Sequence, residues 1–183
     1  MTTTPLDRAA LVRRAIVELV AERGIHGTAM SQVAERAGVA TGTAYVHYKS
    51  KEDLLVSAFV EVKTRLGEAA LAGIDPTIDP RDLFDRVWRN CYKHVASDPA
   101  IADFLLQVEA SPLRHAAHEA LLESDPLTRT AEQLSSVLVE LPVRVLYDLS
   151  LAPVVRLVAS DTQLNQWEMD TLIESCWRAV HRS

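Results

Sequence analysis

Apolar residues recur at spacings of three and four along almost the whole chain, and this periodicity is the feature that most restricts its fold. The clearest repeat consists of Leu55, Ala58, Phe59, Val62, Leu66 and Ala69. This spacing places all six side chains on one side of an α-helix. The alternation of apolar and polar residues that would predict β-strands is absent. The sequence therefore predicts an all-α fold.

Glycine, proline and aspartate divide the chain at helix-length intervals, which predicts about nine helices. They cover about 8–23, 30–37, 41–48, 50–73, 81–97, 99–110, 126–140, 142–159 and 162–181, with a shorter segment at 113–123. The fourth helix has the clearest start, because Ser50 and Asp53 have the spacing of an N-cap pair. Asp-Pro pairs at 75–76 and 79–80 follow its end and mark a break in the chain.

The charge is distributed unevenly. Residues 1–51 carry seven Lys and Arg against four Asp and Glu, a net charge of +3, which leaves −9 for the remainder of a chain whose total is −6. Such asymmetry is typical of a protein with a localised face for a polyanion.

Composition excludes several classes of protein. No run of about 18 uncharged apolar residues is present, so we expect no membrane span. The first eight residues, MTTTPLDR, lack the apolar core of a secretory signal. The two cysteines, Cys91 and Cys176, are too few for a disulfide framework or a zinc cluster. We expect buried thiols, a cytoplasmic location and neither metal nor other cofactor.

The most informative segment covers residues 30–55, MSQVAERAGVATGTAYVHYKSKEDLL. Two short helices are joined here by Ala-Gly-Val. A small residue, Ala34, lets the helices approach closely, Gly38 permits the turn, and Val39 supplies the apolar residue after it. This is the pattern of a helix-turn-helix, whose second helix enters the major groove of DNA.

The segment resembles the N-terminal domain of the TetR (tetracycline-repressor) family. Thr43-Ala44-Tyr45, His47-Tyr48 and residues 49–52 (KSKE) are similar to that family's T-L-Y, H-F and K-S-K-E. The resemblance covers about residues 8–66. Four positions depart from it: Ala40 replaces the usual Ser or Thr N-cap, Ala44 a leucine, Val46 a frequent aromatic residue and Tyr48 a phenylalanine.

The resemblance implies a three-helix DNA-binding domain at 1–51, joined through a long fourth helix to a ligand-binding and dimerisation domain at 52–183. It implies a transcriptional regulator, not an enzyme. A homodimer would repress by binding a palindromic operator in double-stranded DNA, and a small-molecule effector would release it. The hydroxyl, imidazole and amine groups of the segment can reach phosphates or base edges, and a glycine permits close approach. The expected DNA-binding residues are Ser31, Thr41, Gly42, Thr43, Tyr45, His47 and Lys51; Arg13 and Arg14 could also reach phosphates.

The last two predicted helices favour dimerisation. Residues 142–159 are apolar over most of the helix circumference, which predicts burial on more than one side. A second copy of the chain would cover that surface as half of a four-helix interface; packing within one chain is the alternative. The expected interface residues are Leu146, Val154, Val158, Met169, Leu172, Ile173, Cys176, Trp177 and Val180.

Aromatic side chains and side chains with polar tips on otherwise apolar helices are candidates for the ligand pocket, although the same residues could be ordinary core. They are Trp88, Tyr92, Phe104, Gln107 and Tyr147. Few charged residues lie within these stripes, so we expect a mainly apolar ligand.

Two other functions remain open at this point. His115, His118 and Glu119 lie close together and could begin a metal site of a helical metal-dependent enzyme. Their order is not His-Glu-x-x-His and no third ligand of the right kind is evident, so a solvated helix face is the better interpretation. A helical scaffold that does not bind DNA is the other alternative.

Overall fold

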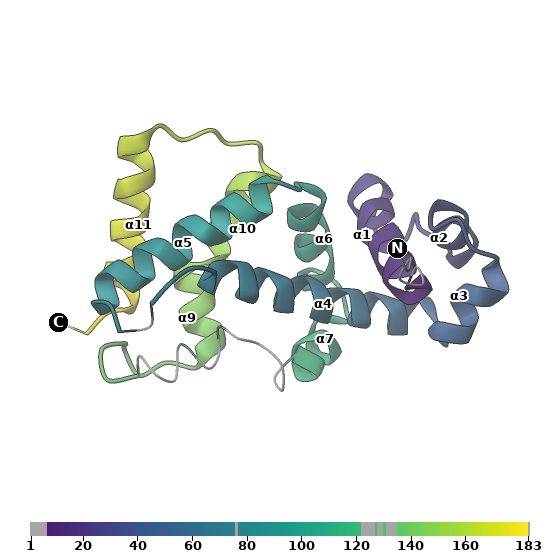
Figure 1. Ribbon diagram of the computed structural model, residues 1–183, viewed down its shortest axis with the longest axis horizontal. Helices are drawn as coiled ribbons and strands as arrows, with labels where there is room; N and C mark the ends of the chain where they lie inside the picture. Colours follow the sequence, from purple (N-terminus) through teal and green to yellow (C-terminus); the bar gives the residue numbers. More distant parts are fainter. Residues whose placement is uncertain (1–6, 76, 122–126, 128–129, 131–134, 183) are drawn as a thin grey trace, which may run out of the picture.

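The computed structural model describes residues 7–75, 77–121, 127, 130 and 135–182. The described residues confirm the all-α prediction. The described part of the chain forms ten helices. They are α1 (Arg8–Arg23), α2 (Met30–Arg36), α3 (Thr41–His47), α4 (Lys51–Leu71), α5 (Pro80–Ala96), α6 (Ala100–Glu109), α7 (Arg114–Leu121), α9 (Val143–Ser150), α10 (Ala152–Ala159) and α11 (Gln166–Val180). The molecule is elongated, with α3 at one end of its long axis (Figure 1).

Local sequence signals define the ends of the helices near the N-terminus. The Asp7 carboxylate caps α1 by accepting a hydrogen bond from the Ala9 N–H at 3.1 Å, and α1 ends at Gly24, whose φ of 75° favours glycine. The Ser50 hydroxyl caps α4 by accepting from the Asp53 N–H at 3.0 Å, as predicted. The Asp53 carboxylate accepts from the Lys49 N–H at 3.1 Å. Two side-chain hydrogen bonds, one accepted by Ser50 and one by Asp53, therefore define the start of α4.

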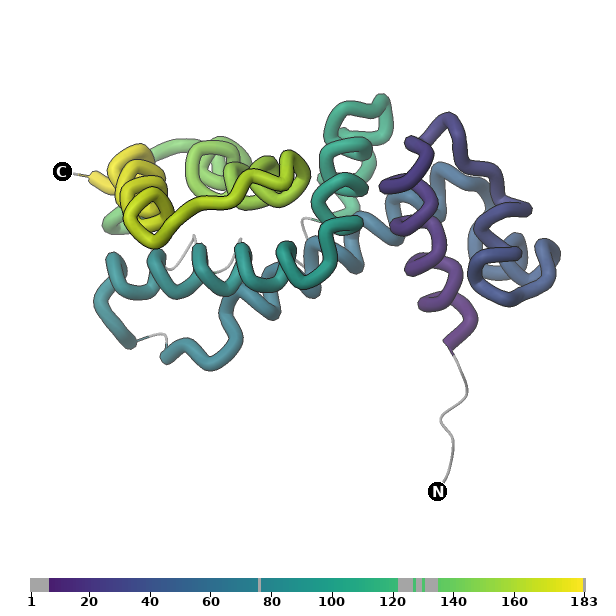
Figure 2. The backbone as a smooth tube through the Cα atoms, turned by 90° about the horizontal axis from the view of Figure 1, so that it is seen from above, coloured from purple at the N-terminus to yellow at the C-terminus, as the bar shows by residue number. Residues whose placement is uncertain are grey.

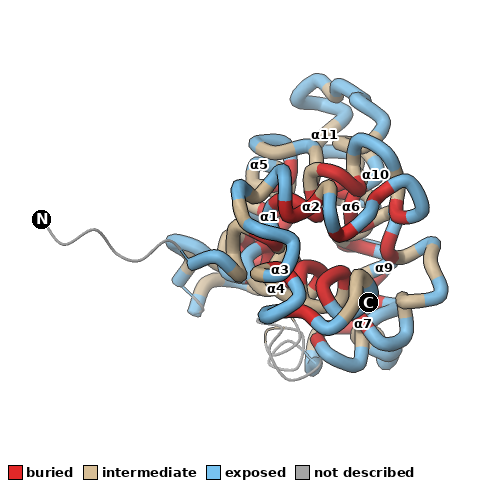
Figure 3. Tube along the Cα trace, turned by 90° about the vertical axis from the view of Figure 1, so that its right-hand side faces the viewer, coloured by how far each residue is buried: buried red, intermediate tan, exposed pale blue. Residues whose placement is uncertain are grey.

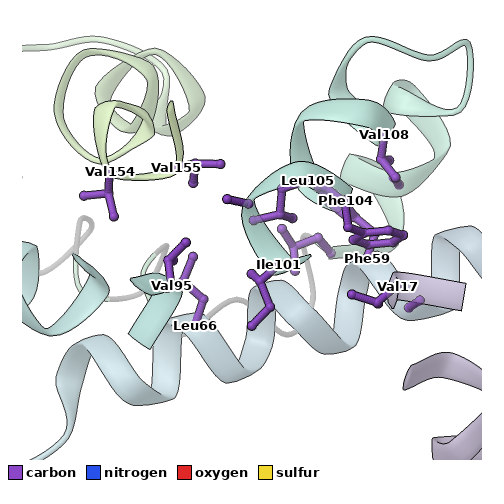
Figure 4. Close-up of a cluster of buried hydrophobic side chains, with 14 of the residues drawn as sticks. Val17, Phe59, Leu66, Val95, Ile101, Phe104, Leu105, Val108, Val154 and Val155 are labelled. Atoms are coloured by element: carbon purple, nitrogen blue, oxygen red, sulfur yellow. The ribbon is translucent and has the colours of Figure 1, made fainter. Parts of the chain in front are cut away.

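The long helix α4 runs through both halves of the molecule. Helices α1–α3 lie at its N-terminal end, and α5 and α7 pack along the remainder (Figure 1). Seen from above, α6 stands between α1 and the helices of the C-terminal half (Figure 2). The buried cluster in Figure 4 shows the result, with Val17 of α1, Phe59 of α4 and Phe104 of α6 close together. One continuous core thus joins the two halves.

The predicted helix at 142–159 is wrong in one respect, because the structure divides it at Leu151 into α9 and α10. Pro153, in the first turn of α10, has no N–H and would clash with a preceding carbonyl in a continuous helix. The break leaves the Ser150 carbonyl free of the helical pattern, and it accepts a hydrogen bond from the Trp88 indole N–H at 3.1 Å.

The predicted helix at 126–140 lies largely outside the described residues. Its last part is not helical. Residues 135–137 form a turn, and Leu138 pairs with His181 in an isolated antiparallel bridge. The Val139 N–H donates to the Val180 carbonyl at 2.8 Å, so backbone pairing fixes this segment to the end of α11.

Because Phe59 is fully buried where α1, α4 and α6 meet, truncation should destabilise the whole molecule. We expect Phe59→Ala to lower the free energy of unfolding by about 3–5 kcal/mol, measured by urea denaturation. Val46→Ala, at a position that is 81% exposed, should change it by less than about 0.5 kcal/mol. If both substitutions changed the free energy of unfolding equally, burial of the Phe59 ring would not be what stabilises the molecule.

Candidate nucleic-acid interface and ligand cavity

Helices α2 and α3 form the predicted helix-turn-helix. Ala34 and Ala44 are buried at 1% and 0% exposure where the two helices meet. Gly38 has a φ of 67°, the left-handed conformation that the turn requires. The Val39 N–H then donates to the Ala34 carbonyl at 3.0 Å. The three residues that signalled this motif in the sequence thus have the roles expected of them.

The outer face of α3 carries polar and apolar side chains that are largely exposed. Tyr45 is 52% exposed and Val46 81% exposed, and a Cβ built on Gly42 would meet no atom within 4 Å. Figure 3 looks onto this end of the molecule. We call this surface the α3 ridge; it consists of the exposed Thr41, Gly42, Tyr45, Val46 and His47. Beside it, Thr43 is half-buried and Ser31 of α2 is exposed.

Lys51 does not extend from this surface as the sequence analysis expected. Its ammonium group donates to the Ile25 carbonyl at 2.9 Å and the Thr28 carbonyl at 3.0 Å. Both acceptors lie in the loop between α1 and α2, so the first residue of α4 fixes that loop. Two of its three N–H groups are thus used within the domain, which gives Lys51 a positioning role and leaves one N–H for the predicted phosphate contact.

Arg13 joins three helices in a similar way. Its guanidinium donates to the Tyr48 hydroxyl at 2.6 Å and pairs with the Glu61 carboxylate of α4. The Tyr48 hydroxyl in turn donates to the Ala9 carbonyl at 3.3 Å. Burial opposes the charge of Arg13, but its hydrogen bonds to Glu61 and Tyr48 raise the pKa of the guanidinium. The chain of contacts Glu61–Arg13–Tyr48 therefore links the middle of α4 to the end of α3.

Much of the positive charge predicted for this end is paired internally. Arg36 bridges Glu18 and Glu22 of α1 at 3.3 and 2.8 Å. Arg14 contacts Glu18 and, across to the segment between α5 and α6, Asp98. The hydrogen bond from Arg36 lowers the pKa of Glu22. These pairs position α2 on α1 and leave a less cationic surface than the sequence indicates.

A cavity of about 600 Å³ lies in the C-terminal half. Its walls come from α4, α5, α7 and α9, and Leu83, Phe84 and Val87 make the α5 wall apolar. Lys63 and Tyr147 face each other there, with the lysine ammonium 3.5 Å from the ring centroid. A cavity of this size and composition is typical of a small-molecule site.

One predicted pocket residue, Tyr147, lines this cavity, and four do not. Trp88 is fully buried, bonds to Ser150 and stacks on Tyr92 at a centroid distance of 6.1 Å. Phe104 belongs to the core that joins the two halves. Gln107 is exposed on α6, beside Gly24. Periodicity identified these residues as inward-facing or amphipathic but could not separate core from cavity.

Sequence reasoning missed Lys63, although a signal was present. It follows Phe59 by four residues and precedes Leu66 by three, so it lies on the apolar side of α4. A lysine at such a position is rare unless paired. Arg144, which sequence reasoning did not connect with a pocket, is another residue on the cavity wall.

The residues considered for a metal site lie on the cavity wall. His115, His118 and Glu119 line the cavity, and His118 is hydrogen-bonded to Glu109 at 2.8 Å. Within the described ranges, no group of three or more His, Cys, Asp or Glu is placed to hold a metal ion. Nor is any helix in those ranges long and apolar enough to cross a membrane.

Two sequence models match the chain in order. The model described as "Bacterial regulatory proteins, tetR family" matches residues 12–58, and "Tetracyclin repressor-like, C-terminal domain" matches residues 81–181. The second match alone covers more than half of the 183 residues. The chain belongs to the TetR family. It is thus a transcriptional regulator with a DNA-binding helix-turn-helix, and family and fold indicate a regulator instead of an enzyme.

Several TetR-family relatives extend over the full chain. An uncharacterized HTH-type transcriptional regulator of Haemophilus influenzae is 26% identical over 188 residues, covering 100% of both chains. The structure of a putative TetR-family regulator from Vibrio parahaemolyticus superimposes with a TM-score of 0.78 at 26% identity, covering 97% of this chain and 100% of that one. The fatty acid metabolism regulator protein of Bacillus subtilis is 51% identical over 47 residues, 26% of this chain and 24% of that one.

The expected dimer face of this TetR-family regulator stays a prediction, and the protomer itself already buries much of it. Six of the nine predicted interface residues are buried within the protomer, which leaves them little surface for a partner: Leu146, Val154, Ile173, Cys176, Trp177 and Val180. Val158, Met169 and Leu172 are half-buried. The apolar side chains that remain exposed nearby are Leu141, Val145, Leu149 and Trp167.

The contacts of Lys51 predict a loss of stability on substitution. We expect Lys51→Met to lower the free energy of unfolding by about 1–3 kcal/mol, because the Ile25 and Thr28 carbonyls lose their donor. Lys49→Met is the matched control, since Lys49 is exposed, and it should unfold as the wild type does. Thermal and urea denaturation give both values. A Lys51→Met protein of unchanged stability would show that the lysine does not fix the loop.

Proposed function

We propose that this TetR-family regulator is a repressor that binds a palindromic operator as a homodimer and is released by a small, mainly apolar ligand in its C-terminal half. The observation that carries the DNA-binding part is the α3 ridge. A valine that is 81% exposed and a tyrosine that is 52% exposed lie side by side on a helix whose other face is buried. A groove of DNA would cover both.

The ridge has the groups that DNA recognition needs. The Tyr45 hydroxyl and the His47 imidazole can donate to phosphate oxygens. The methyl groups of Val46 and Thr41 can contact thymine methyl groups, and Gly42 has open space above it. Many basic residues nearby are paired internally. Base contacts, and the two α3 ridges of a dimer, must therefore supply a larger share of the affinity for DNA than phosphate contacts.

The proposed dimer would use the outer side of α9. Val145 and Leu149 are 38% and 41% exposed, and their spacing of four places them in one row on α9. Leu141, 42% exposed, precedes the helix. Helix α11, which packs against α9, carries Trp167 at 73% exposure in its first turn. A row of this kind on a soluble protein is typical of an interface. Binding to a palindromic operator would require the two-fold axis to place the two α3 ridges at half-sites about 34 Å apart.

Release by a ligand would pass through α4, the helix with contacts in both halves. Lys63 of α4 lines the cavity, whereas Glu61, half a turn away, pairs with Arg13 of α1. A ligand that favours one position of α4 would change the placement of α3 through Arg13 and Tyr48. A coupling of about 1–3 kcal/mol would weaken operator binding 5- to 150-fold.

The DNA-binding proposal is tested on the ridge itself. We expect Tyr45→Ala and His47→Ala each to weaken binding to DNA flanking the protein's own gene by roughly tenfold or more, about 1.4 kcal/mol. Fluorescence anisotropy at fixed salt measures this. Neither substitution should change the melting temperature by more than a few degrees, because both side chains are exposed. Lys93→Ala, at an exposed position of α5, is the control and should bind as the wild type does.

If no flanking fragment binds below micromolar protein concentration, the repressor proposal fails and the scaffold alternative gains support. If the ridge variants bind DNA as well as the wild type, another surface makes the contact.

The dimer proposal is tested by placing charge in the α9 row. We expect the double variant Val145→Glu/Leu149→Glu to sediment as a monomer and to bind DNA weakly, because a partner would bury both carboxylates without counterions. Val46→Glu, an exposed valine at the other end of the molecule, should sediment as the wild type does. An unchanged mass for the double variant would exclude this face.

A further inference from the structure

Lys63 is the least expected residue in the cavity wall. Its side chain lies on the apolar side of α4 and is 5% exposed. A buried ammonium group that lacks a counterion is costly, because it has lost its hydration. Lysines at such positions normally have a carboxylate partner.

No carboxylate among the described residues lies within ion-pair distance of Lys63. Its one close partner is the ring of Tyr147, at 3.5 Å from the ammonium nitrogen to the centroid. A cation–π contact offsets part of the lost hydration but accepts no directed hydrogen bond from the three N–H groups. Lys63 therefore has capacity for a hydrogen-bond acceptor on the cavity side.

The other charged groups nearby are of the same sign, paired or exposed. Arg144, in the first turn of α9, also lines the cavity and has no ion-pair partner among the described residues. The Glu109 carboxylate is taken by His118 at 2.8 Å. Burial acts to raise the pKa of Glu109, but the hydrogen bond from His118 and the charges of Lys63 and Arg144 lower it. Glu119 is exposed at the α7 wall.

The remaining wall is apolar. Leu83, Phe84 and Val87 of α5 line one side, and Leu146 of α9 and Val180 of α11 line another. The cavity thus combines a broad hydrocarbon surface with a cationic group that is almost fully buried. A neutral apolar molecule would leave the ammonium without an acceptor, and a highly charged one would leave the hydrocarbon wall unfilled.

We infer that the cavity binds an amphipathic monocarboxylate, with the carboxylate hydrogen-bonded to Lys63 and a hydrocarbon body against the α5 wall. This inference rests on the proposed function and makes its ligand more specific. One buried ammonium group suits a singly charged head. A phosphate group is normally held by several backbone N–H groups or an arginine cluster, and the cavity has one buried cation.

The position of Lys63 gives such a ligand a path to the DNA-binding end. Lys51, Glu61 and Lys63 all belong to α4. The first two are bonded to the loop after α1 and to Arg13 of α1. A carboxylate that forms a hydrogen bond with Lys63 therefore acts on the same helix that positions α1 and α3.

The test compares an acid with the alcohol of the same chain length. Full-length protein, stripped of co-purified lipid on a hydrophobic resin, is titrated by calorimetry with decanoate and with 1-decanol below their aggregation limits. We expect one decanoate per chain, bound about 10- to 100-fold more tightly than decanol. Across hexanoate, octanoate and decanoate, each added methylene should improve Kd roughly fourfold.

Lys63→Met removes the ammonium and keeps the apolar stem. This variant should lose the preference for the acid and keep its affinity for decanol, and retained decanol binding reports an intact cavity. Lys93→Met, at an exposed position of α5, is the matched control and should behave as the wild type. Equal binding of acid and alcohol by the wild type would overturn the inference, as would a Lys63→Met protein that still prefers the acid.

Operator release is measured separately by anisotropy with decanoate added. Binding that depends on Lys63 without any effect on DNA would contradict ligand release and leave the carboxylate site in place. The opposite result is also informative. If decanol releases the protein from DNA as well as decanoate does, the carboxylate site is contradicted and the repressor function is left in place.

Discussion

The structure depends on α4 contributing to both halves of one continuous core. Its first turns pack against α1, and its later turns pack against α5 and α7. Phe59 lies in between, where Val17 of α1 and Phe104 of α6 reach it from both halves (Figure 4). Burial of these side chains removes the independence that two domains joined by one helix would otherwise have. The molecule is therefore better described as one packed body with two functional ends.

This arrangement explains how two distant sites can share one mechanical element. The distance along α4 from Lys51 to Lys63 is about 18 Å at the rise of an α-helix. Over that length the helix contacts the loop after α1, the guanidinium of Arg13 and then the cavity. Packed interiors have discrete arrangements and do not deform continuously. A small displacement at one end of α4 must therefore be accommodated by contacts at the other.

Sequence alone predicted what is determined locally. The all-α class, the turn at Gly38 and the cap at Ser50 depend on residues within a few positions of one another, and the structure confirms them. The partners of Lys51 and Arg13 are distant in sequence, at up to 48 positions for Arg13 and Glu61. Residue type cannot reveal such pairs, so both basic residues were assigned to DNA when each is bonded within the protein.

The C-terminal half was harder to predict for a related reason. A helix that is apolar around most of its circumference, such as α9, does not disclose which side its own chain covers. Leu146 faces inward while Val145 and Leu149 face outward, and only tertiary packing decides between them. The break at Leu151 was different, because Pro153 was visible in the sequence and its steric effect is local. Lys63 was visible too, as a charge in an apolar stripe.

The shared core around Phe59 limits how this regulator can exchange parts with its relatives. Recombination that joined its first 51 residues to another sensing half would bring α1 against a foreign α6, with Val17 facing side chains that had not been selected to fit it. Arg13 and Arg14 would also lose Glu61 and Asp98. Substitutions on the exposed side of α3 would disturb none of these contacts, so this surface can vary more easily than the whole N-terminal part can be exchanged.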